Sequence, residues 1–368
     1  MRQVAVIGAG FGDEGKGKVV SHLCSYLPSP LVIRFSGGHQ AGHRVMVNGV
    51  DHVFSNFGSG TIQGIPTYWS EHCTVDPVGL INEYNILQAK GVDPIIYLNE
   101  RCPTTTPFDK AANLSREAIQ KHGTCGVGVG QTHQREEEYY SLKVRDLFFP
   151  WVLKTRLWQI ERYYSNLPMI PAHLIDDFLF CCEELSKLDT IKVVEGIEKI
   201  PHLDSMIFEG AQGLLLDQHY GFFPHVTRGN TGMTNITAMG FSPEIWLVTR
   251  AYQTRHGTGP MSNQGLPLKV KTINDHNRDD GHQGKFRIAP LDLSLLKYVI
   301  NQDKMIKNRR PQVMVITCLD MLQEYKLTKD SITYEYSSKD NFLDVIMSYL
   351  SIDELYISKT PGPELIRY

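Results

Sequence analysis

Short apolar runs recur along the chain and alternate with longer stretches of helical periodicity. The runs are rich in β-branched residues and end at turn residues; they read QVAVIGA, PLVIRF, DPIIYL, MIFEGA, EIWLVTRAY and VMVITCL. Runs of this kind are typical of strands covered on both faces, as in a parallel sheet. Between them, stretches such as residues 292–302 place apolar side chains on one helical face. We therefore predict an α/β fold with a central, mostly parallel sheet flanked by helices.

The chain of 368 residues is predicted to form a single domain. No internal repeat, low-complexity tract or linker divides it. The segment from about 109 to 205 is poor in strand signals, and its periodicity predicts a mainly helical insertion. The expected architecture is one domain over residues 1–368 that carries this insertion.

Charge and cysteine content narrow the classes of partner. The net charge is −3, so no basic field covers the molecule and nucleic acid is not expected as the main partner. Seven cysteines are scattered without a CxxC pair or metal-binding spacing, which is typical of reduced thiols in a cytosolic protein. No apolar run reaches the roughly 18 residues of a membrane span, and the first residues read as a buried strand. We expect a cytoplasmic protein without a membrane partner.

The first apolar run leads into a glycine-rich loop, AVIGAGFGDEGKGKVV. The spacing G-x-x-x-x-G-K ends at Lys16 as in a Walker A loop, but Gly17 stands where a magnesium-binding Ser or Thr is usual. The dinucleotide fingerprint GxGxxG fails, because Asp13 takes the place of its third glycine. A carboxylate beside phosphates is repulsive unless it binds a cation or moves a proton, so Asp13 is a candidate for both roles. The alternative is that Asp13 and Glu14 only cap the following helix.

Four later segments carry polar candidates beside glycines or strand ends. RFSGGHQAGHRV places His43 after Gly42, which makes His43 a candidate general acid or else a structural histidine. HGTCGVGVGQTH is either a flexible turn or a nest of N–H groups for an anion. FEGAQGLLLD places Gln212 just past a strand end, where ligands bind in open α/β sheets. VITCLD ends in Asp320, whose two oxygens could accept from the N1 and N2 donors of a guanine.

Taken together and in this order, the segments resemble the adenylosuccinate synthetase family, whose members join aspartate to IMP with GTP. The matching blocks span almost the whole chain, and the length is close to that of short archaeal and viral members. Several blocks are similar rather than identical to the family's YPxVT, TRVGxGP, TKLD and STGP. The blocks are GDEGKGK at 12–18, GGHQAGH at 37–43, GTCGVGVG at 123–130, EGAQGLLLD at 209–217, FPHVT at 223–227, TRHGTGP at 254–260, TCLD at 317–320 and SKTPGPE at 358–364.

The resemblance implies a mechanism in two steps. Asp13 would remove the N1 proton of IMP, while its carboxylate and the Gly42 carbonyl help to bind Mg²⁺. The 6-oxygen would attack the γ-phosphate of GTP, with His43 as acid or hydrogen-bond donor, to form 6-phosphoryl-IMP. Lys16 would neutralise charge on the transferred group. The amine of aspartate would then displace phosphate at C6.

The resemblance also implies three sets of binding residues, and a homodimer whose active sites are completed across the interface. GTP would contact Gly12, Gly15, Lys16, Gly17, Gly42, Asp320, Gly362 and Pro363. The purine nucleotide substrate would contact Asp13, Gln40, Thr124, Cys125, Gln212 and Thr227, and aspartate would contact Gln283, Lys285 and Arg287.

Several departures from the family pattern bear on the substrate. Gln40 replaces a nucleotide-contacting asparagine, and Cys125 replaces a phosphate-binding threonine with a weaker donor. The aspartate loop, TTGRRRR in the family, aligns with HQGKFRI at 282–288, where lysine cannot bind a carboxylate bidentately as arginine does. The arginine that reaches the neighbouring subunit's nucleotide has no clear counterpart in QREEEYYS, where Arg135 lies at a shifted position.

Alternatives to the IMP ligase stay open. A related viral enzyme couples aspartate to dGMP, and in one such pattern a serine replaces the loop aspartate. Asp13 therefore favours IMP, whereas the altered loops keep dGMP or another 6-oxopurine nucleotide as an alternative. A GTP-binding regulatory protein without ligase chemistry is a second alternative, although Asp13 and His43 would have no use in it. An NAD-dependent dehydrogenase is disfavoured, because the third glycine and a ribose-binding acid are missing.

Overall fold

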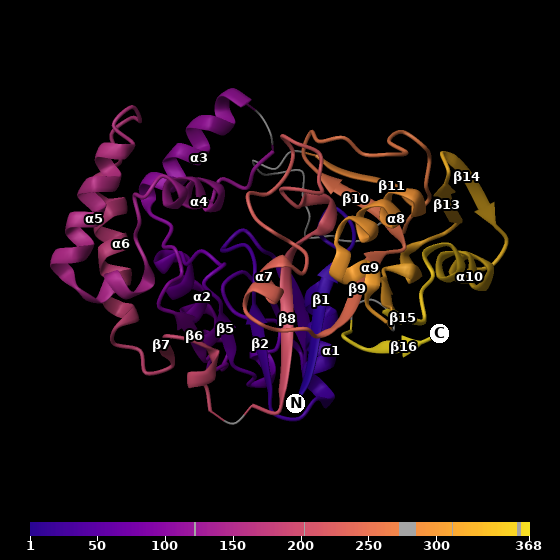
Figure 1. Cartoon of the computed structure of the whole chain (residues 1–368), viewed down its shortest axis with the longest axis horizontal. Coiled ribbons are helices and arrows are strands. Elements are labelled where there is room, and N and C mark those ends of the chain that lie inside the picture. The colour runs from indigo at the N-terminus through magenta and orange to yellow at the C-terminus, as the bar shows by residue number, and fades with distance from the viewer. Residues whose placement is uncertain (121–122, 202, 272–284, 311, 359–361) are drawn as a thin grey trace.

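A large twisted sheet runs through the middle of the molecule (Figure 1). The structure is a computed structural model that describes residues 1–120, 123–201, 203–271, 285–310, 312–358 and 362–368. Within these ranges, ten strands are ordered β16-β15-β12-β9-β1-β8-β2-β5-β6-β7, and only β16 runs antiparallel to its neighbour. Their bounds are β1 Arg2–Gly8, β2 Pro30–Arg34, β5 Thr67–Trp69, β6 Ile96–Asn99, β7 Ile191–Val194, β8 Ser205–Gly213, β9 Glu244–Arg250, β12 Val313–Thr317, β15 Glu354–Ser358 and β16 Leu365–Arg367.

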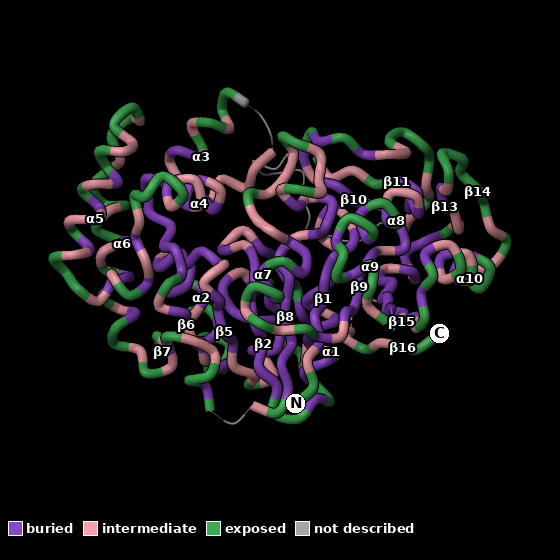
Figure 2. Tube along the Cα trace, viewed as in Figure 1, coloured by how far each residue is buried: buried purple, intermediate pink, exposed green. Residues whose placement is uncertain are grey.

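Both faces of this sheet are covered, as the apolar runs predict. In β1, Val4 and Val6 pack into one buried cluster with residues of α1, whereas Ala5 and Ile7 pack into another with residues of α8 and α10. Figure 2 shows the central strands as the most continuously buried part of the chain. The predicted α/β fold with a mostly parallel sheet is therefore confirmed. The helices of this part are α1 Lys16–Tyr26, α2 Pro77–Ala89, α7 Thr234–Ala238, α8 Leu293–Gln302, α9 Lys304–Asn308 and α10 Lys339–Leu350.

The segment from about 109 to 205 lies at one end of the sheet and is mostly helical (Figure 1). Its Leu157, Phe178 and Leu185 belong to an apolar cluster that also contains residues of the β3–β4 hairpin (residues 43–54), β5 and α2. One strand that the sequence did not lead us to expect, β7, extends the sheet beyond β6. The helices are α3 Pro107–Gln120, α4 Val129–Glu137, α5 Pro150–Tyr163 and α6 Ala172–Leu185, with short 3-10 helices η2 Val144–Phe148 and η3 Ile197–Lys199.

Two smaller sheets follow strands of the large one. The hairpin of β3 (His43–Val47) and β4 (Val50–Phe54) comes after β2. A four-stranded sheet, ordered β10-β11-β13-β14, begins directly after β9. Its strands are β10 Tyr252–His256, β11 Phe286–Asp292, β13 Tyr325–Lys329 and β14 Ile332–Tyr336, and the remaining 3-10 helices are η1 Thr61–Gln63, η4 Leu214–Leu216 and η5 Leu319–Met321.

None of the helices described above is both long and apolar enough to cross a membrane.

Candidate active site

The candidate residues gather at the carboxyl edge of the large sheet. Because β1, β2, β8 and β12 run parallel, the loops that follow them leave the same edge. Gly8 at the end of β1 lies opposite Gly213 of β8, and Arg34 at the end of β2 lies opposite Glu209. Ligands of open α/β sheets bind at this edge.

Glu14 does not cap α1, so the capping alternative is wrong for this residue. The helix begins after Gly15, whose φ is 85°, and it has no side-chain cap. The buried Glu14 carboxylate turns back into the loop, where it accepts from Gly10 N at 3.0 Å and Gly12 N at 2.8 Å. Its Oε2 lies 2.6 Å from Lys16 Nζ, and both side chains are buried. Glu14 therefore compensates the charge of Lys16 in this state of the loop.

Glycines make room for the Glu14 carboxylate. A Cβ added at Gly8 would lie 2.4 Å from Glu14 Oε2, and one added at Gly213 would lie 2.3 Å from Glu14 Oε1. Both distances are shorter than any side chain could tolerate without movement. The glycines that suggest a phosphate loop thus also hold an internal carboxylate, a role that the sequence analysis missed.

Gly17 departs from a Walker A loop for a steric reason. A Cβ at this position would lie 2.8 Å from the Cβ of His43 and 2.8 Å from Ser59 Oγ. A serine or threonine here would therefore collide with the start of β3. The close packing of α1 on β3 excludes the usual magnesium-binding hydroxyl and brings His43 next to the loop.

Asp13 is held at its backbone and at its side chain. Its φ is 59°, in the left-handed region, and its carbonyl accepts from Arg250 Nε at 2.5 Å. Its Oδ2 lies 3.3 Å from His256 Nε2, and the carboxylate is 32% exposed. Burial raises the pKa of Asp13, but the His256 contact and the charges of Arg250 and Lys16 outweigh burial and leave the pKa below its usual value. Asp13 is consequently ionised at neutral pH.

His43 forms a buried dyad with Glu209. Its Nδ1 lies 2.6 Å from Glu209 Oε1, and a carboxylate can only accept, so Nδ1 carries the proton, while Nε2 lies 3.5 Å from the Ala211 carbonyl oxygen. Ser59 donates its hydroxyl and its N–H to the same carboxylate. Burial raises the pKa of Glu209, but the charge and hydrogen bond of His43, together with Arg34 and Ser59, lower it to about 2. Glu209 is a second residue that the sequence analysis missed, although it stands at the start of the quoted EGAQG block.

Gln40 and Gln212 lie on either side of Gly37. A Cβ at Gly37 would lie 3.1 Å from Gln40 Nε2 and 3.4 Å from Gln212 Oε1. The Oε1 atoms of both glutamines are buried and accept no hydrogen bond from any residue that the structure describes. Buried polar atoms are nearly always paired in folded proteins. Two such acceptors, on side chains that both lie close to Gly37, are available to a ligand.

Thr124 and Cys125 lie in the loop between α3 and α4. Thr124 Oγ1 accepts from Asn113 Nδ2 at 3.0 Å, and Gly128 N donates to Asn113 Oδ1 at 3.1 Å. Asn113 of α3 thus shapes the loop that the sequence assigns to a phosphate. Thr227 lies on a separate loop, where its N–H donates to Leu216 O at 2.8 Å.

Two arginines lie side by side after β9. Arg287, one of the predicted aspartate contacts, donates to Gly259 O at 2.6 Å and to Gln264 Oε1 at 2.7 Å. The buried Arg255, which the sequence analysis missed, donates to two backbone carbonyls. Burial and then the positive charge of Arg287 lower the pKa of Arg255 to about 10.

Because the acceptors around these two guanidinium groups are neutral oxygens, their positive charge suits an anionic ligand. The predicted contact Lys285 is exposed. The predicted contact Gln283 lies outside the described residues.

Asp320 follows β12 within η5. The preceding Cys318 has φ 57°, and Thr317 Oγ1 donates to Glu14 O at 2.7 Å. The end of β12 is therefore fastened to the glycine-rich loop. Gly362 and Pro363 follow β15, which pairs with β12, so both candidates leave the same edge of the sheet as Asp320.

Arg135 does not reach toward a neighbouring subunit. It is fully buried, and its Nε lies 2.9 Å from Asp109 Oδ1. Its Nη2 donates to Thr104 O at 2.8 Å, and Tyr164 Oη donates to the same Asp109 at 2.9 Å. Arg135 therefore ties α4 to α3 and the end of α5.

The predicted Mg²⁺ donors fit the ion by chemistry. Proteins hold Mg²⁺ through one or two carboxylates together with waters and substrate phosphates. Asp13 offers a partly exposed carboxylate, and Gly42 is exposed and offers a carbonyl. No group of three or more His, Cys, Asp or Glu suited to a metal is present in the ranges given above.

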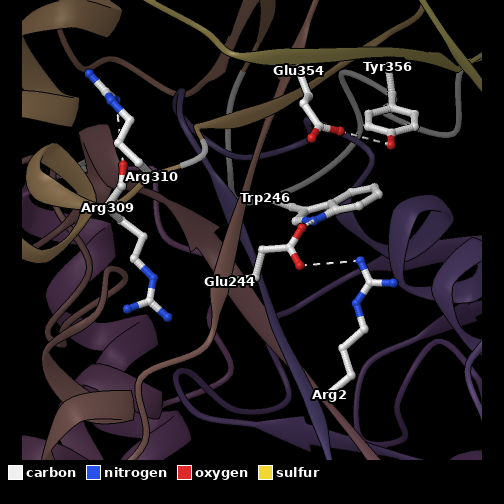
Figure 3. Close-up of a pocket in the computed structure, with 7 residues that line it drawn as sticks. All are labelled: Arg2, Glu244, Trp246, Arg309, Arg310, Glu354 and Tyr356. Atoms are coloured by element: carbon white, nitrogen blue, oxygen red, sulfur yellow. Dashed lines mark hydrogen bonds and ion pairs between the residues drawn. The ribbon is translucent and has the colours of Figure 1, made fainter.

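A cavity of about 380 Å³ lies at the opposite, amino edge of the sheet (Figure 3). Arg2 of β1 points toward Glu244 of β9, 3.2 Å away, and Tyr356 of β15 donates to Glu354 at 3.3 Å. The Trp246 ring stacks on Tyr356 and donates to Glu244 at 2.6 Å. Arg2 and Glu244 pair between neighbouring strands, whereas the other two hydrogen bonds lie within β9 and β15.

Comparison with known proteins identifies the family of the chain. The sequence model of the family described as adenylosuccinate synthetase matches residues 5–358. The chain belongs to the adenylosuccinate synthetase family. Members of this family are ligases that form carbon–nitrogen bonds, and the protein is an enzyme of that class.

Relatives of the same family are similar over most of their length. Adenylosuccinate synthetase 1 of Pseudoalteromonas translucida (strain TAC 125) is 31% identical over 306 residues, which cover 77% of this chain and 69% of that protein. Adenylosuccinate synthetase of Francisella tularensis subsp. tularensis (strain WY96-3418) is 29% identical over 376 residues, which cover 96% of this chain and 85% of the relative.

Two solved structures share the fold. Fully ligated adenylosuccinate synthetase from Plasmodium falciparum superposes with a TM-score of 0.80 at 18% identity, covering 99% of both chains. Succinoaminodeoxyadenylate synthetase of cyanophage S-2L, bound to dGMP and dATP, has a TM-score of 0.65 at 14% identity and covers 100% of this chain and 95% of its own.

Proposed function

We propose that the protein joins L-aspartate to IMP with GTP as phosphoryl donor, and releases adenylosuccinate, GDP and phosphate. The observation that carries the proposal is the partly exposed carboxylate of Asp13, which lies within a loop suited to phosphate and 3.3 Å from His256 Nε2. A protein that only bound nucleotide would gain nothing from this charge, since it repels phosphate. A base that removes a proton from the purine needs this negative charge.

The first step is proton removal and phosphoryl transfer. Asp13 accepts the N1 proton of IMP, and the 6-oxygen attacks the γ-phosphate of GTP to give 6-phosphoryl-IMP and GDP. His43 serves this step through Nε2, because Glu209 holds its Nδ1. Lys16 offsets the negative charge on the transferred phosphoryl group. To do so, Lys16 leaves its ion pair with Glu14 and contacts the phosphate instead.

GTP lies along the loop that contains Gly12, Gly15 and Gly17, and its base is read by Asp320. We assign the closing contacts of that base to Gly362 and Pro363, and a further contact to Gly42. This assignment is supported by the hydrogen bond from Thr317 Oγ1 to Glu14 O. It joins the end of β12, which leads to Asp320, to the glycine-rich loop.

The purine nucleotide substrate lies against Gln40 and Gln212, whose buried acceptors need a partner. Its phosphate is bound by the loop of Thr124 and Cys125, with Thr227 from a separate loop. Bound nucleotide would thus supply the hydrogen bonds that these side chains lack.

In the second step, the amine of aspartate displaces phosphate at C6. Arg287 and Arg255 bind the carboxylates of aspartate, and Lys285 adds positive charge at the exposed side. Gln283 remains a predicted contact of the same amino acid.

The Asp13 carboxylate and the Gly42 carbonyl would hold Mg²⁺. When bound, it supplies positive charge to the phosphates of the donor nucleotide. The cytoplasmic homodimer expected from the resemblance is part of the proposal, and sedimentation of the purified protein tests the dimer.

The alternative substrate is dGMP. The fold that the chain shares with the cyanophage enzyme, whose structure holds dGMP, and the replacements at Gln40 and Cys125 favour it. Asp13 in the loop favours IMP. We keep IMP as the proposed substrate.

Parallel incubations with Mg²⁺, aspartate, GTP or ATP, and IMP or dGMP test the proposal, with products identified by mass spectrometry. A succinyl product from IMP and GTP is expected. A product from dGMP alone would replace IMP by the alternative substrate. The absence of product from either nucleotide would instead support a binding protein without ligase chemistry.

A further inference from the structure

Residue 256 is a histidine where the family pattern has a different residue. In TRHGTGP it occupies the position of the valine in the family pattern TRVGxGP. The fold brings this imidazole to 3.3 Å from Asp13 Oδ2. We propose that His256 is a positioning residue that aims the Asp13 carboxylate at the purine base. The inference rests on the proposed role of Asp13 as the base.

His256 is itself held in place. It is the last residue of β10, where it pairs with Phe286 of the neighbouring β11. The two rings lie 4.8 Å apart at an angle of 47°. Gly257 follows with φ 78°, a conformation that glycine adopts without strain, so the chain turns away directly after the imidazole. The imidazole is 18% exposed, which leaves it little freedom to move away from Asp13.

The segment from the end of β9 to the end of β10, which carries His256, also holds the backbone of Asp13. Arg250, at the end of β9, donates to Asp13 O at 2.5 Å. Its guanidinium lies 5.7 Å from the centre of the Phe286 ring, which also packs on His256. Arg250 and His256 therefore pack on the same Phe286 ring and both contact Asp13. Arg250 contacts its carbonyl, and His256 contacts its carboxylate.

Asp13 needs both contacts because of its conformation. A residue other than glycine in the left-handed region is strained and persists only when its surroundings hold it. The carboxylate is also partly exposed, so its side-chain torsions would be free without a partner. A hydrogen bond at Oδ2 fixes the torsions and leaves Oδ1 to face the N1 proton of the base. Valine, which has no polar atom, cannot supply this contact.

The following variants remove or displace the donor that faces Asp13 Oδ2. His256→Val removes the contact and restores the residue of the family pattern. His256→Gln keeps a donor close to the position of Nε2, whereas His256→Asn places its donor near Nδ1 instead. His173→Val on the exposed part of α6 is the matched control. Melting temperatures show whether each variant is folded.

We expect His256→Val to lower kcat about 10- to 100-fold, as small displacements of a catalytic group do, with the KM for GTP unchanged. His256→Gln should recover a kcat within about threefold of the parent, because its donor still reaches Oδ2. His256→Asn should resemble His256→Val. A folded His256→Val enzyme with the parent kcat would overturn the proposal, and so would equal losses in the Gln and Asn variants.

A double-mutant comparison separates this inference from the proposed function. In an Asp13→Asn background, the residual rate in long incubations should not change further when His256→Val is added, since His256 acts through Asp13. A further loss in that background would overturn the positioning role and leave the proposed function standing. If Asp13→Asn alone kept the parent rate, the base role would fail and the positioning role would fail with it.

Discussion

The two edges of the central sheet are built from the same strands but carry different polar groups. At the amino edge, Arg2 and Glu244 pair at 3.2 Å with side chains 45% and 28% exposed. At the carboxyl edge, Lys16 and Glu14 pair at 2.6 Å with side chains 2% and 3% exposed. Water weakens an exposed pair, whereas a buried charge depends on its partner. The comparison indicates that the amino edge tolerates change and the carboxyl edge does not.

The carboxyl edge also holds residues with unusual backbone conformations and neutral groups without a partner. Asp13 and Cys318 at the carboxyl edge adopt positive φ without being glycine. Gln40 and Gln212 bury acceptors that lack a partner among the described residues. Strain and unsatisfied groups of this kind collect where a ligand is bound. The predictions below concern five residues and test how sharply the two edges differ.

Removal of the Asp13 carboxylate should have the largest effect. Asp13→Ala is expected to lower kcat by about 10²- to 10⁴-fold, the range for loss of a general acid or base. The KM for GTP should change much less, because the loop keeps its N–H groups and Lys16. Steady-state rates from product mass spectrometry give both constants. A kcat near that of the parent would mean that another group removes the proton.

The substitution Glu209→Gln should have the next largest effect on kcat. Without the carboxylate, the His43 ring loses the group that fixes its Nδ1 proton, and kcat should fall about 100-fold, less than for a catalytic carboxylate itself. The folded enzyme should keep its affinity for GTP. An unchanged kcat would show that the dyad serves stability alone.

The same variant should change stability in acid. The Glu209 pKa of about 2 lies below its unfolded value near 4.5, so its stabilisation is complete above the unfolded pKa and is lost as the pH falls through about 2. Urea unfolding of the parent should therefore show a loss between those values that Glu209→Gln lacks. Similar pH profiles for both proteins would contradict the shift.

Arg287→Leu should weaken aspartate binding. Loss of a charge-assisted hydrogen bond corresponds to roughly 30-fold in KM for aspartate. Arg287→Lys should lose less, since it keeps the charge but not the bidentate geometry. The KM for IMP should stay close to that of the parent. Equal effects on both substrates would place Arg287 outside the aspartate site.

Asp320→Asn should reduce the preference for GTP over ATP about tenfold, since an amide matches only one of the two guanine donors that a carboxylate accepts. The KM for IMP should not respond. Competition between the two triphosphates in one incubation measures the preference directly. A uniform loss with both would indicate a structural role for Asp320.

The smallest effect is expected at the amino edge. Arg2→Ala should leave kcat unchanged and lower the free energy of unfolding by about 0.2–1 kcal/mol, as for other exposed ion pairs. Chemical denaturation together with the activity assay measures both quantities. A clear loss of activity would show that the cavity at this edge communicates with the active site.

Local patterns in the sequence were sufficient for six strands of the central sheet, for the helix over 292–302 and for the loops that follow those strands. Each apolar run predicted from periodicity lies in the central sheet, and the glycine-rich loop precedes a helix as expected, but β5, β7, β15 and β16 were not predicted. The four-stranded sheet was missed because it joins segments far apart in the chain. The assignments of Gln40 and Gln212 remain predictions, supported by their buried acceptors.

Partners of the site residues could not be predicted, because they depend on distances between segments far apart in the sequence. The sequence by itself determined the fold class, the family and the loop in which Asp13 lies. Only the tertiary structure decided that Glu14 turns inward to Lys16, that Arg135 is bound by Asp109 and that His256 faces Asp13. Periodicity and turn residues act over a few positions, whereas the contact of His256 with Asp13 forms only after the parallel strands β1 and β9 bring their carboxyl ends to one edge.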